Sequence, residues 1–185
     1  MRSDTYVHPG QRLLCQGCHE PRRSAPAVPK RLPLAFRRPP SKIKSDVEGS
    51  NPFSFPRLVQ PVLERNCVEC HQREPAAIDL GKGDWEKKPD YRYTSYDNLR
   101  EFAFFFGSFR NTYDPWTTPR TIPGRFGARA SKLYQILKGG HHDVKLSKED
   151  FHRITLWLDC NSDFFGSYEN TEAQAKADVV EATLE

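Results

Sequence analysis

Residues 55–71 read FPRLVQPVLERNCVECH and combine a helical pattern with a motif of reactive side chains. The apolar residues before the motif recur at the spacing of one helix face: they are Leu58, Val59, Val62 and Leu63. Pro61 is compatible with this pattern because proline is tolerated in the first turn of a helix. We therefore predict a short helix that leads the chain directly to Cys67.

The motif at the end of this stretch is Cys67-Val68-Glu69-Cys70-His71, and the same pattern occurs earlier as Cys15-Gln16-Gly17-Cys18-His19. Two cysteines separated by two residues and followed at once by histidine form the attachment motif of c-type haem. The thiols bond to the vinyl groups of the porphyrin, and the histidine lies under the iron as an axial ligand. We expect two covalent haem c groups, one on Cys15, Cys18 and His19 and the other on Cys67, Cys70 and His71.

Other uses of paired cysteines explain this pattern less well. A zinc site shared by both pairs would span a much longer gap than is usual, since Cys18 and Cys67 lie far apart in the sequence. A thioredoxin-like redox motif would follow a strand, and no strand signal precedes either pair. Neither zinc nor structural disulfides require a histidine directly after each pair. A zinc-bound interaction domain without haem is the remaining non-haem alternative.

The sixth ligand of each iron is a separate question. Met1 is the only methionine, so methionine is a poor candidate. The turn Gly139-Gly140-His141-His142 is the best source, because two glycines let the backbone approach a porphyrin closely. For the second iron we expect His71 with either His141 or His142, and the alternative is a five-coordinate iron. For the first iron the candidates are His8, a residue outside this fragment, or an open position.

Capping residues and apolar spacing predict further helices. Ser131 can cap a helix that ends at Gly139-Gly140. Ser147 and Asp150 form a possible capping box for the next helix, whose apolar face contains Phe151, Ile154 and Leu158. The Phe-rich segment 95–109 also has helical character. Strand signals are weak, so the predicted fold class is mainly α with extensive loops.

Composition limits the partners of the chain. Its 185 residues are 37% hydrophobic and 28% charged, which suits a soluble protein. No stretch approaches the roughly 18 consecutive apolar residues of a membrane-spanning helix, so we predict no membrane span. Residues 1–50 carry ten Lys and Arg against four Asp and Glu, but prolines interrupt this basic part and aromatic residues are not interleaved with it. We interpret it as a solvated or docking segment and expect no nucleic-acid partner.

These patterns divide the chain into four segments. They are a first haem-binding segment over 1–23, a Pro-rich basic connector over 24–51, a haem domain over 52–168 and an acidic tail over 169–185. Haem is attached to thiols outside the cytoplasm, yet the residues after Met1 are polar and lack the hydrophobic region of a signal peptide. We therefore expect a periplasmic or otherwise extracytoplasmic protein whose signal peptide lies upstream of this fragment.

Two parts of the chain resemble a known family. Phe55–His71 resembles the opening of planctomycete-type cytochrome c domains, and the segments 131–134, 139–142 and 153–161 resemble their ending. Together with Cys18-His19-Glu20-Pro21 ahead of the connector, the two motifs resemble the haem-bearing C-terminal half of hydrazine synthase alpha-subunit-like proteins. The resemblance covers most of residues 10–168. It implies that 52–168 is a cytochrome c-like domain and that a propeller-like domain precedes it.

The resemblance also bears on function. In that family the first haem is the active-site haem, the second is ligated by two histidines, and a tyrosine shortly after the first motif ligates the first iron. This chain has Glu20-Pro21-Arg22-Arg23 there, without tyrosine. We expect a dihaem electron-transfer region within a larger exported protein, with a redox partner protein or an upstream domain of the same polypeptide as its partner. The alternative is a haem enzyme, related to hydrazine synthase or peroxidase-like, with chemistry at the first haem.

Overall fold

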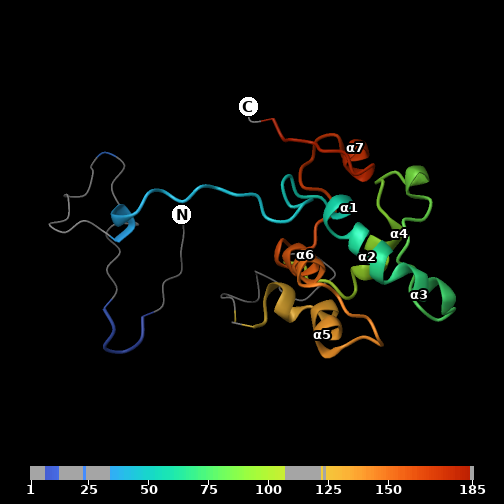
Figure 1. The fold of residues 1–185 in the computed structure, drawn as a ribbon, viewed down its shortest axis with the longest axis horizontal. Coiled ribbons are helices and arrows are strands. Elements are labelled where there is room, and N and C mark those ends of the chain that lie inside the picture. Colours follow the sequence, from blue (N-terminus) through green and yellow to red (C-terminus); the bar gives the residue numbers. More distant parts are fainter. Residues whose placement is uncertain (1–6, 13–22, 24–33, 107–121, 123, 184–185) are drawn as a thin grey trace. The chain divides into compact units, whose positions relative to one another are not determined.

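The computed structural model describes residues 7–12, 23, 34–106, 122 and 124–183 and divides the chain into two compact units (Figure 1). The first unit is Met1–Lys44 and the second is Ser45–Glu185. Within the described residues of the first unit, a turn joins Gln11 N–H to the His8 carbonyl, and a 3-10 turn, η1, covers Leu34–Arg37. The first motif, Cys15–His19, lies outside the described residues.

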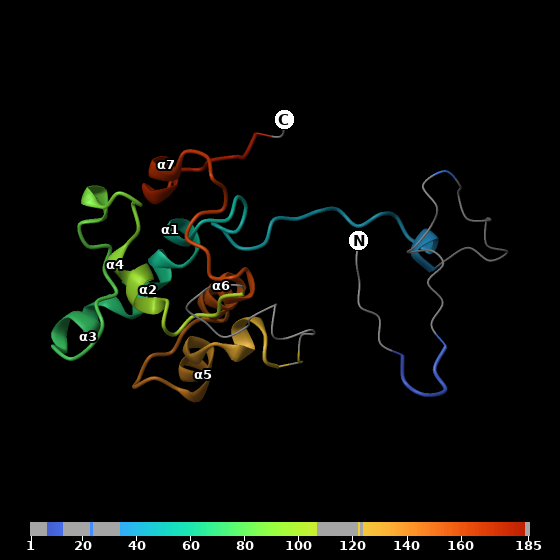
Figure 2. The same ribbon diagram turned by 180° about the vertical axis from the view of Figure 1, so that it is seen from behind.

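The second unit is helical, which confirms the predicted mainly α class. Its described residues form no strand and have only two isolated bridges, Ser50 with Phe53 and Ser54 with Phe165. Short helices alternate with long loops, and α5 and α6 lie side by side in both views (Figures 1 and 2). The elements are α1 (Phe55–Leu58), α2 (Gln60–Asn66), α3 (Val68–Arg73), η2 (Trp85–Lys87), α4 (Thr94–Leu99), η3 (Gly127–Ala130), α5 (Lys132–Gly139), α6 (Lys148–Asp159) and α7 (Thr171–Ala175).

Helices α1, α2 and α3 confirm the helix predicted before Cys67. All four apolar residues of the predicted stripe are buried. Val59 separates α1 from α2, because Pro61 has no N–H to continue the helical hydrogen bonds across this point. Cys67 then separates α2 from α3, and its N–H bonds to the Leu63 carbonyl at 2.8 Å. The motif Cys67–His71 is thereby held by the helical backbone.

The caps of α5 and α6 follow the sequence closely. The Ser131 hydroxyl accepts from Tyr134 N–H at 3.1 Å, and the Ser147 hydroxyl accepts from Asp150 N–H at 3.0 Å. The prediction of the second bond of the capping box, from Ser147 N–H to the Asp150 carboxylate, is wrong. The carboxylate instead accepts from the Arg65 guanidinium at 2.6 Å. This ion pair joins α6 to α2 and so fixes two walls of the cavity described below.

The Phe-rich segment 95–109 is helical only as far as Leu99. Beyond it the helical prediction is wrong for the described residues, which turn at Glu101 and run as irregular chain to Phe106. The Phe102 carbonyl accepts from Leu133 N–H at 2.9 Å and so bonds to α5, whereas the N–H groups of Phe102 and Ala103 bond locally to the Leu99 carbonyl at 2.9 and 3.0 Å. Phe104 and Phe105 are both buried in this irregular segment. Phe109 lies outside the described residues.

An aromatic cluster forms the centre of the unit. Its members are buried and meet mostly edge to face, with ring centroids 5.0 to 6.5 Å apart: Phe55, Tyr93, Tyr96, Trp157 and Phe164. Such contacts add to the free energy gained by burying the rings. The segment 169–185, suggested by the sequence as a tail, contributes α7 to this core. Ala175 is fully buried, and its carbonyl accepts from the Tyr93 hydroxyl.

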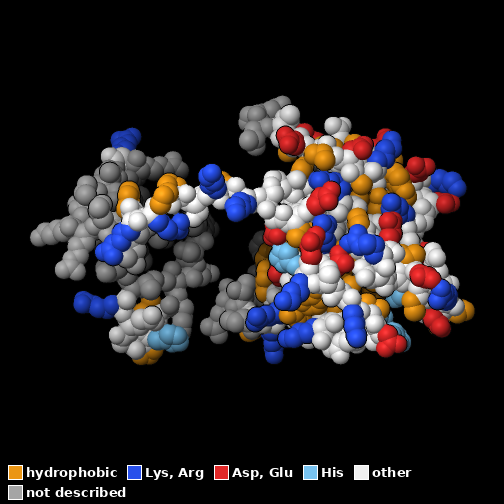
Figure 3. All heavy atoms as spheres, viewed as in Figure 1, with side chains coloured by type: hydrophobic (Ala, Val, Ile, Leu, Met, Phe, Trp, Pro, Cys, Tyr) orange, Lys and Arg blue, Asp and Glu red, His pale blue; other side chains and the backbone are white. Residues whose placement is uncertain are grey.

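The surface of the second unit is mixed in charge. Figure 3 shows Lys and Arg side chains interspersed with Asp and Glu over the face in view. No helix among the residues that the structure describes has the length and apolar character needed to cross a membrane.

Candidate haem site

The residues of the second motif border an apolar cavity of about 150 Å³. Its walls come from α2 and α3, from the loop after α3, and from α4, α5 and α6. The lining residues are Leu63, Cys67, His71, Ile78, Leu80, Leu99, Phe102, Leu133, Ile136, Leu137, His141 and Ile154. Apart from the Cys67 thiol and the two imidazoles, every lining side chain is aliphatic or aromatic hydrocarbon. Such a lining suits the flat apolar body of a porphyrin.

His71 and His141 face this cavity together. Their ring centroids are 6.0 Å apart and their ring planes are inclined by 41°. A metal–imidazole bond of about 2.0 Å, with the ring centroid about 1.1 Å beyond the nitrogen, places two imidazoles on opposite sides of one ion with centroids about 6 Å apart. The observed separation therefore fits two axial ligands of a single iron.

The orientation of the His71 ring is set by the backbone. Its Nδ1 lies 2.9 Å from the carbonyl oxygen of Ile78. A carbonyl oxygen only accepts hydrogen bonds, so Nδ1 must carry the proton. The proton-free Nε2 is then the nitrogen available to a metal, an arrangement typical of metal-binding histidines.

His141, rather than His142, reaches the cavity. Gly140 has φ of 91°, a conformation that glycine adopts readily, and His142 turns away with φ of 49°. His142 is exposed, and its ring packs edge to face on His141 with centroids 4.6 Å apart. Burial, followed by the proximity of His142 and His71, lowers the pKa of His141. The neutral imidazole that this favours is the form that binds metals.

The two thiols of the motif differ in environment. Cys67 lines the cavity, whereas Cys70 is exposed on α3, and neither forms a disulfide. Burial, with smaller contributions from Asp150 and Cys70, raises the pKa of the Cys67 thiol to about 11. Only Cys67 therefore borders the cavity, whereas Cys70 lies on the exposed side of α3.

The remaining predicted residues lie elsewhere. Cys15, Cys18 and His19 are outside the described residues, and His8 belongs to the first unit. His152 is exposed on α6, and its Nε2 lies 3.0 Å from both carboxylate oxygens of Asp46. The Ile78 carbonyl was missed by sequence reasoning because a backbone acceptor leaves no mark in the residue type.

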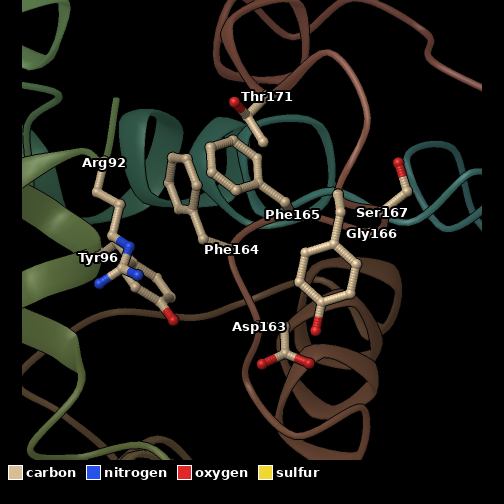
Figure 4. Close-up of a pocket in the computed structure, with 9 residues that line it drawn as sticks. Arg92, Tyr96, Asp163, Phe164, Phe165, Gly166, Ser167 and Thr171 are labelled. Carbon is tan, nitrogen blue, oxygen red and sulfur yellow. The ribbon is translucent and has the colours of Figure 1, made fainter. Parts of the chain in front are cut away.

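A second, more polar pocket of about 300 Å³ lies beside the aromatic cluster (Figure 4). It shares no lining residue with the apolar cavity. Arg92 and Asp163 supply one positive and one negative group, and Tyr96 and Phe164 supply aromatic walls. Partial burial raises the pKa of Asp163. This pocket lacks the paired histidines and thiols that distinguish the first.

No protein-family model, curated protein or solved structure matches this chain. The chemistry of the apolar cavity is therefore inferred from its own residues.

Proposed function

We propose that residues 52–168 form a c-type cytochrome domain in which Cys67 and Cys70 attach one haem c and His71 and His141 ligate its iron. The observation that carries this proposal is the pair of imidazoles 6.0 Å apart across an apolar cavity that borders the Cys-x-x-Cys-His motif. A porphyrin supplies the other four nitrogen ligands, so two protein ligands complete the coordination of the iron.

The activity that follows is electron transfer. A bound haem c would supply one-electron exchange between ferric and ferrous iron. His71 and His141 would both hold the iron, which favours electron transfer over binding of a substrate. The walls of the cavity are hydrocarbon, and the Ile78 carbonyl holds the His71 ring in one orientation. Bis-histidine ligation favours a low reduction potential relative to methionine–histidine ligation.

The first motif extends this proposal to the whole chain. A second haem c on Cys15, Cys18 and His19 would make the chain a dihaem region of a larger exported protein. Its electron partner would be a redox protein or an upstream domain of the same polypeptide. Because haem is attached to thiols outside the cytoplasm, we propose a periplasmic or otherwise extracytoplasmic location.

The alternative is a haem enzyme with chemistry at the first haem, as the resemblance to hydrazine synthase alpha-subunit-like proteins suggests. The feature that favours it is the lack of an assured sixth ligand beside Cys15–His19, since only His8 precedes the motif closely. The feature that disfavours hydrazine synthesis itself is the sequence Glu20–Arg23, which has no tyrosine.

Production of the chain in the bacterial periplasm, together with the haem-attachment machinery, tests the proposal. The alkaline pyridine haemochrome spectrum should show c-type haem at two per chain. The double variant C67A/C70A should retain one haem per chain, and C160A, which removes the third described cysteine, should retain two. Absence of c-type haem from the unsubstituted chain would overturn the proposal.

The same double variant separates the two functions. Because only the first haem remains in C67A/C70A, its ferric form can be examined alone by electron paramagnetic resonance. A low-spin signal would support electron transfer at both haems. A high-spin signal would indicate an open axial position and so favour chemistry there.

A further inference from the structure

Gln60 is a polar residue at the centre of the core. Its side chain lies in α2 and is 0% exposed, whereas glutamine is rarely fully buried in proteins. The amide is hydrogen-bonded on both sides: its Oε1 accepts from the Ser95 hydroxyl at 2.6 Å, and its Nε2 donates to the Leu80 carbonyl at 3.3 Å. A weaker contact of 3.4 Å joins Nε2 to Glu64. The amide thus links α2, α4 and the loop that follows α3.

That loop is held at four successive carbonyls, the last being that of Lys82, which accepts from Thr94 N–H at 3.0 Å. The Asp79 carbonyl accepts from the Asn98 amide at 2.8 Å, the Leu80 carbonyl accepts from Gln60, and the Gly81 carbonyl accepts from Ser95 N–H at 2.9 Å. The next carbonyl toward the N-terminus is that of Ile78, which accepts from His71 Nδ1 at 2.9 Å. The acceptor that orients His71 is therefore adjacent to a segment fixed by α2 and α4.

We infer that Gln60 is a positioning residue for the His71 ligand and thereby tunes the second haem. This inference rests on the proposed function. Gln60 lines neither the cavity nor the His71 ring, so it acts only through the loop. A hydrogen bond from Nδ1 to a carbonyl increases electron donation by the imidazole to the iron, and such outer partners commonly decide the properties of a metal site. Holding Ile78 in place keeps this bond short and the ring plane fixed.

The substitution Gln60→Met tests the inference, because methionine fills a similar volume without hydrogen-bonding the loop. In the haem-loaded chain we expect the second haem to remain low-spin. We expect its largest ferric g-value to shift or broaden, since that value depends on the relative orientation of the two ring planes. We also expect its reduction potential to rise, because a weaker Nδ1 hydrogen bond reduces donation to the ferric iron.

Two further variants separate positioning from general loss of stability. Val59→Ala removes packing from a fully buried neighbour of Gln60, and it should lower the melting temperature while leaving the g-values and potential unchanged. Asn98→Ala removes the side-chain amide that donates to the Asp79 carbonyl, and this change is made at a partly exposed position rather than in the core. It should shift the largest ferric g-value and the reduction potential in the same direction as Gln60→Met. This expectation holds even if Gln60→Met folds poorly.

The outcomes divide clearly. Unchanged g-values and potential in Gln60→Met and Asn98→Ala, with haem attached at Cys67 and Cys70, would overturn this inference alone. If Gln60→Met does not fold, the same unchanged values in Asn98→Ala would overturn it. A wild-type chain without c-type haem at the second motif would overturn the proposed function and the inference with it. Equal shifts in Val59→Ala would also overturn it, because the effect would then follow stability rather than the loop.

Discussion

Two adjacent histidines of this chain occupy different environments. His141 lines the apolar cavity with His71, whereas His142 is exposed and packs its ring edge to face on His141. The turn that separates them has positive φ at two residues, Gly140 and His142. We therefore predict that His141 and His142, although adjacent in sequence, differ in their effect on the iron of the proposed haem.

Substituting each histidine tests that difference. His141→Ala should convert the second ferric haem from low-spin to high-spin, because its distal nitrogen is lost. His142→Ala should leave the haem low-spin, since its ring does not line the cavity. Electron paramagnetic resonance of the ferric protein measures both. Retention of low-spin iron in His141→Ala together with its loss in His142→Ala would show that the wrong neighbour has been assigned.

The thiols of the second motif should also differ in reactivity before haem is attached. Burial raises the pKa of Cys67 to about 11, and only the thiolate attacks an alkylating reagent. In the haem-free chain at pH 8, we expect iodoacetamide to modify the exposed Cys70 at least about tenfold faster than Cys67. Peptide mass spectrometry over a time course measures the two rates. Equal rates would contradict the burial of Cys67.

At the scale of single elements, the two serine caps should contribute unequally. Ser147 makes one cap bond at an exposed position, whereas the buried Ser131 also donates to the Ala128 carbonyl at 2.8 Å. Loss of a cap costs about 1 kcal/mol, and loss of the second, buried hydrogen bond of Ser131 adds about 1 kcal/mol, although the Ala128 carbonyl keeps its bond from Ser131 N–H at 3.0 Å. We expect the free energy of unfolding to fall by about 1 kcal/mol in Ser147→Ala and by about 2 kcal/mol in Ser131→Ala.

Urea unfolding followed by circular dichroism measures these changes. Lys148→Ala, at the exposed first residue of α6, serves as the control and should change stability by less than about 0.5 kcal/mol. A larger loss in Ser147→Ala than in Ser131→Ala would contradict the roles of the two caps.

Elements with local signals could be predicted from the sequence, and those without could not. The stripe before Cys67 and the serines at 131 and 147 act within a few residues, so helices α1, α2, α5 and α6 were predictable. The segment after Leu99 was not, because dense apolar residues suit a buried irregular chain as well as a helix. For the proposed haem site, the spacing of the motif predicts His71 as the proximal ligand. The choice between His141 and His142 depends on backbone torsions. The role of the Ile78 carbonyl depends on its tertiary contact with His71, which the sequence does not reveal.

For the whole molecule, the aromatic core predicts loss of stability in alkali. Burial raises the pKa of Tyr93 and of Tyr96 to about 12 each, against an ordinary value of 10.0. Between these values the unfolded state releases protons that the folded state keeps, so stability falls as pH rises from about 10 to about 12. The expected loss is at most roughly 1.4 kcal/mol per pH unit for each tyrosine.

Urea unfolding at pH 9, 10 and 11 checks this pH dependence. Tyr96→Phe should lower the slope of stability against pH above pH 10, because one buried phenol no longer titrates. Tyr93→Phe should do the same and should also lower stability at pH 7, because its bond to the Ala175 carbonyl is lost. Tyr168→Phe is the control, since Tyr168 is fully exposed. Unchanged slopes in both core variants would contradict the prediction.

The attachment of α7 to Tyr93 has a consequence for the order in which the protein matures. Chains are synthesised from the N-terminal end, so Cys67, Cys70 and His71 emerge well before His141, and Ala175 emerges last of these. The cavity walls contributed by α5 and α6 are absent at first, as is the core contact between Tyr93 and Ala175. In the proposed cytochrome, a chain exported from its N-terminal end would present both thiols outside the cytoplasm before α5 and α6, so a porphyrin could be bonded to them while the cavity is still open on that side.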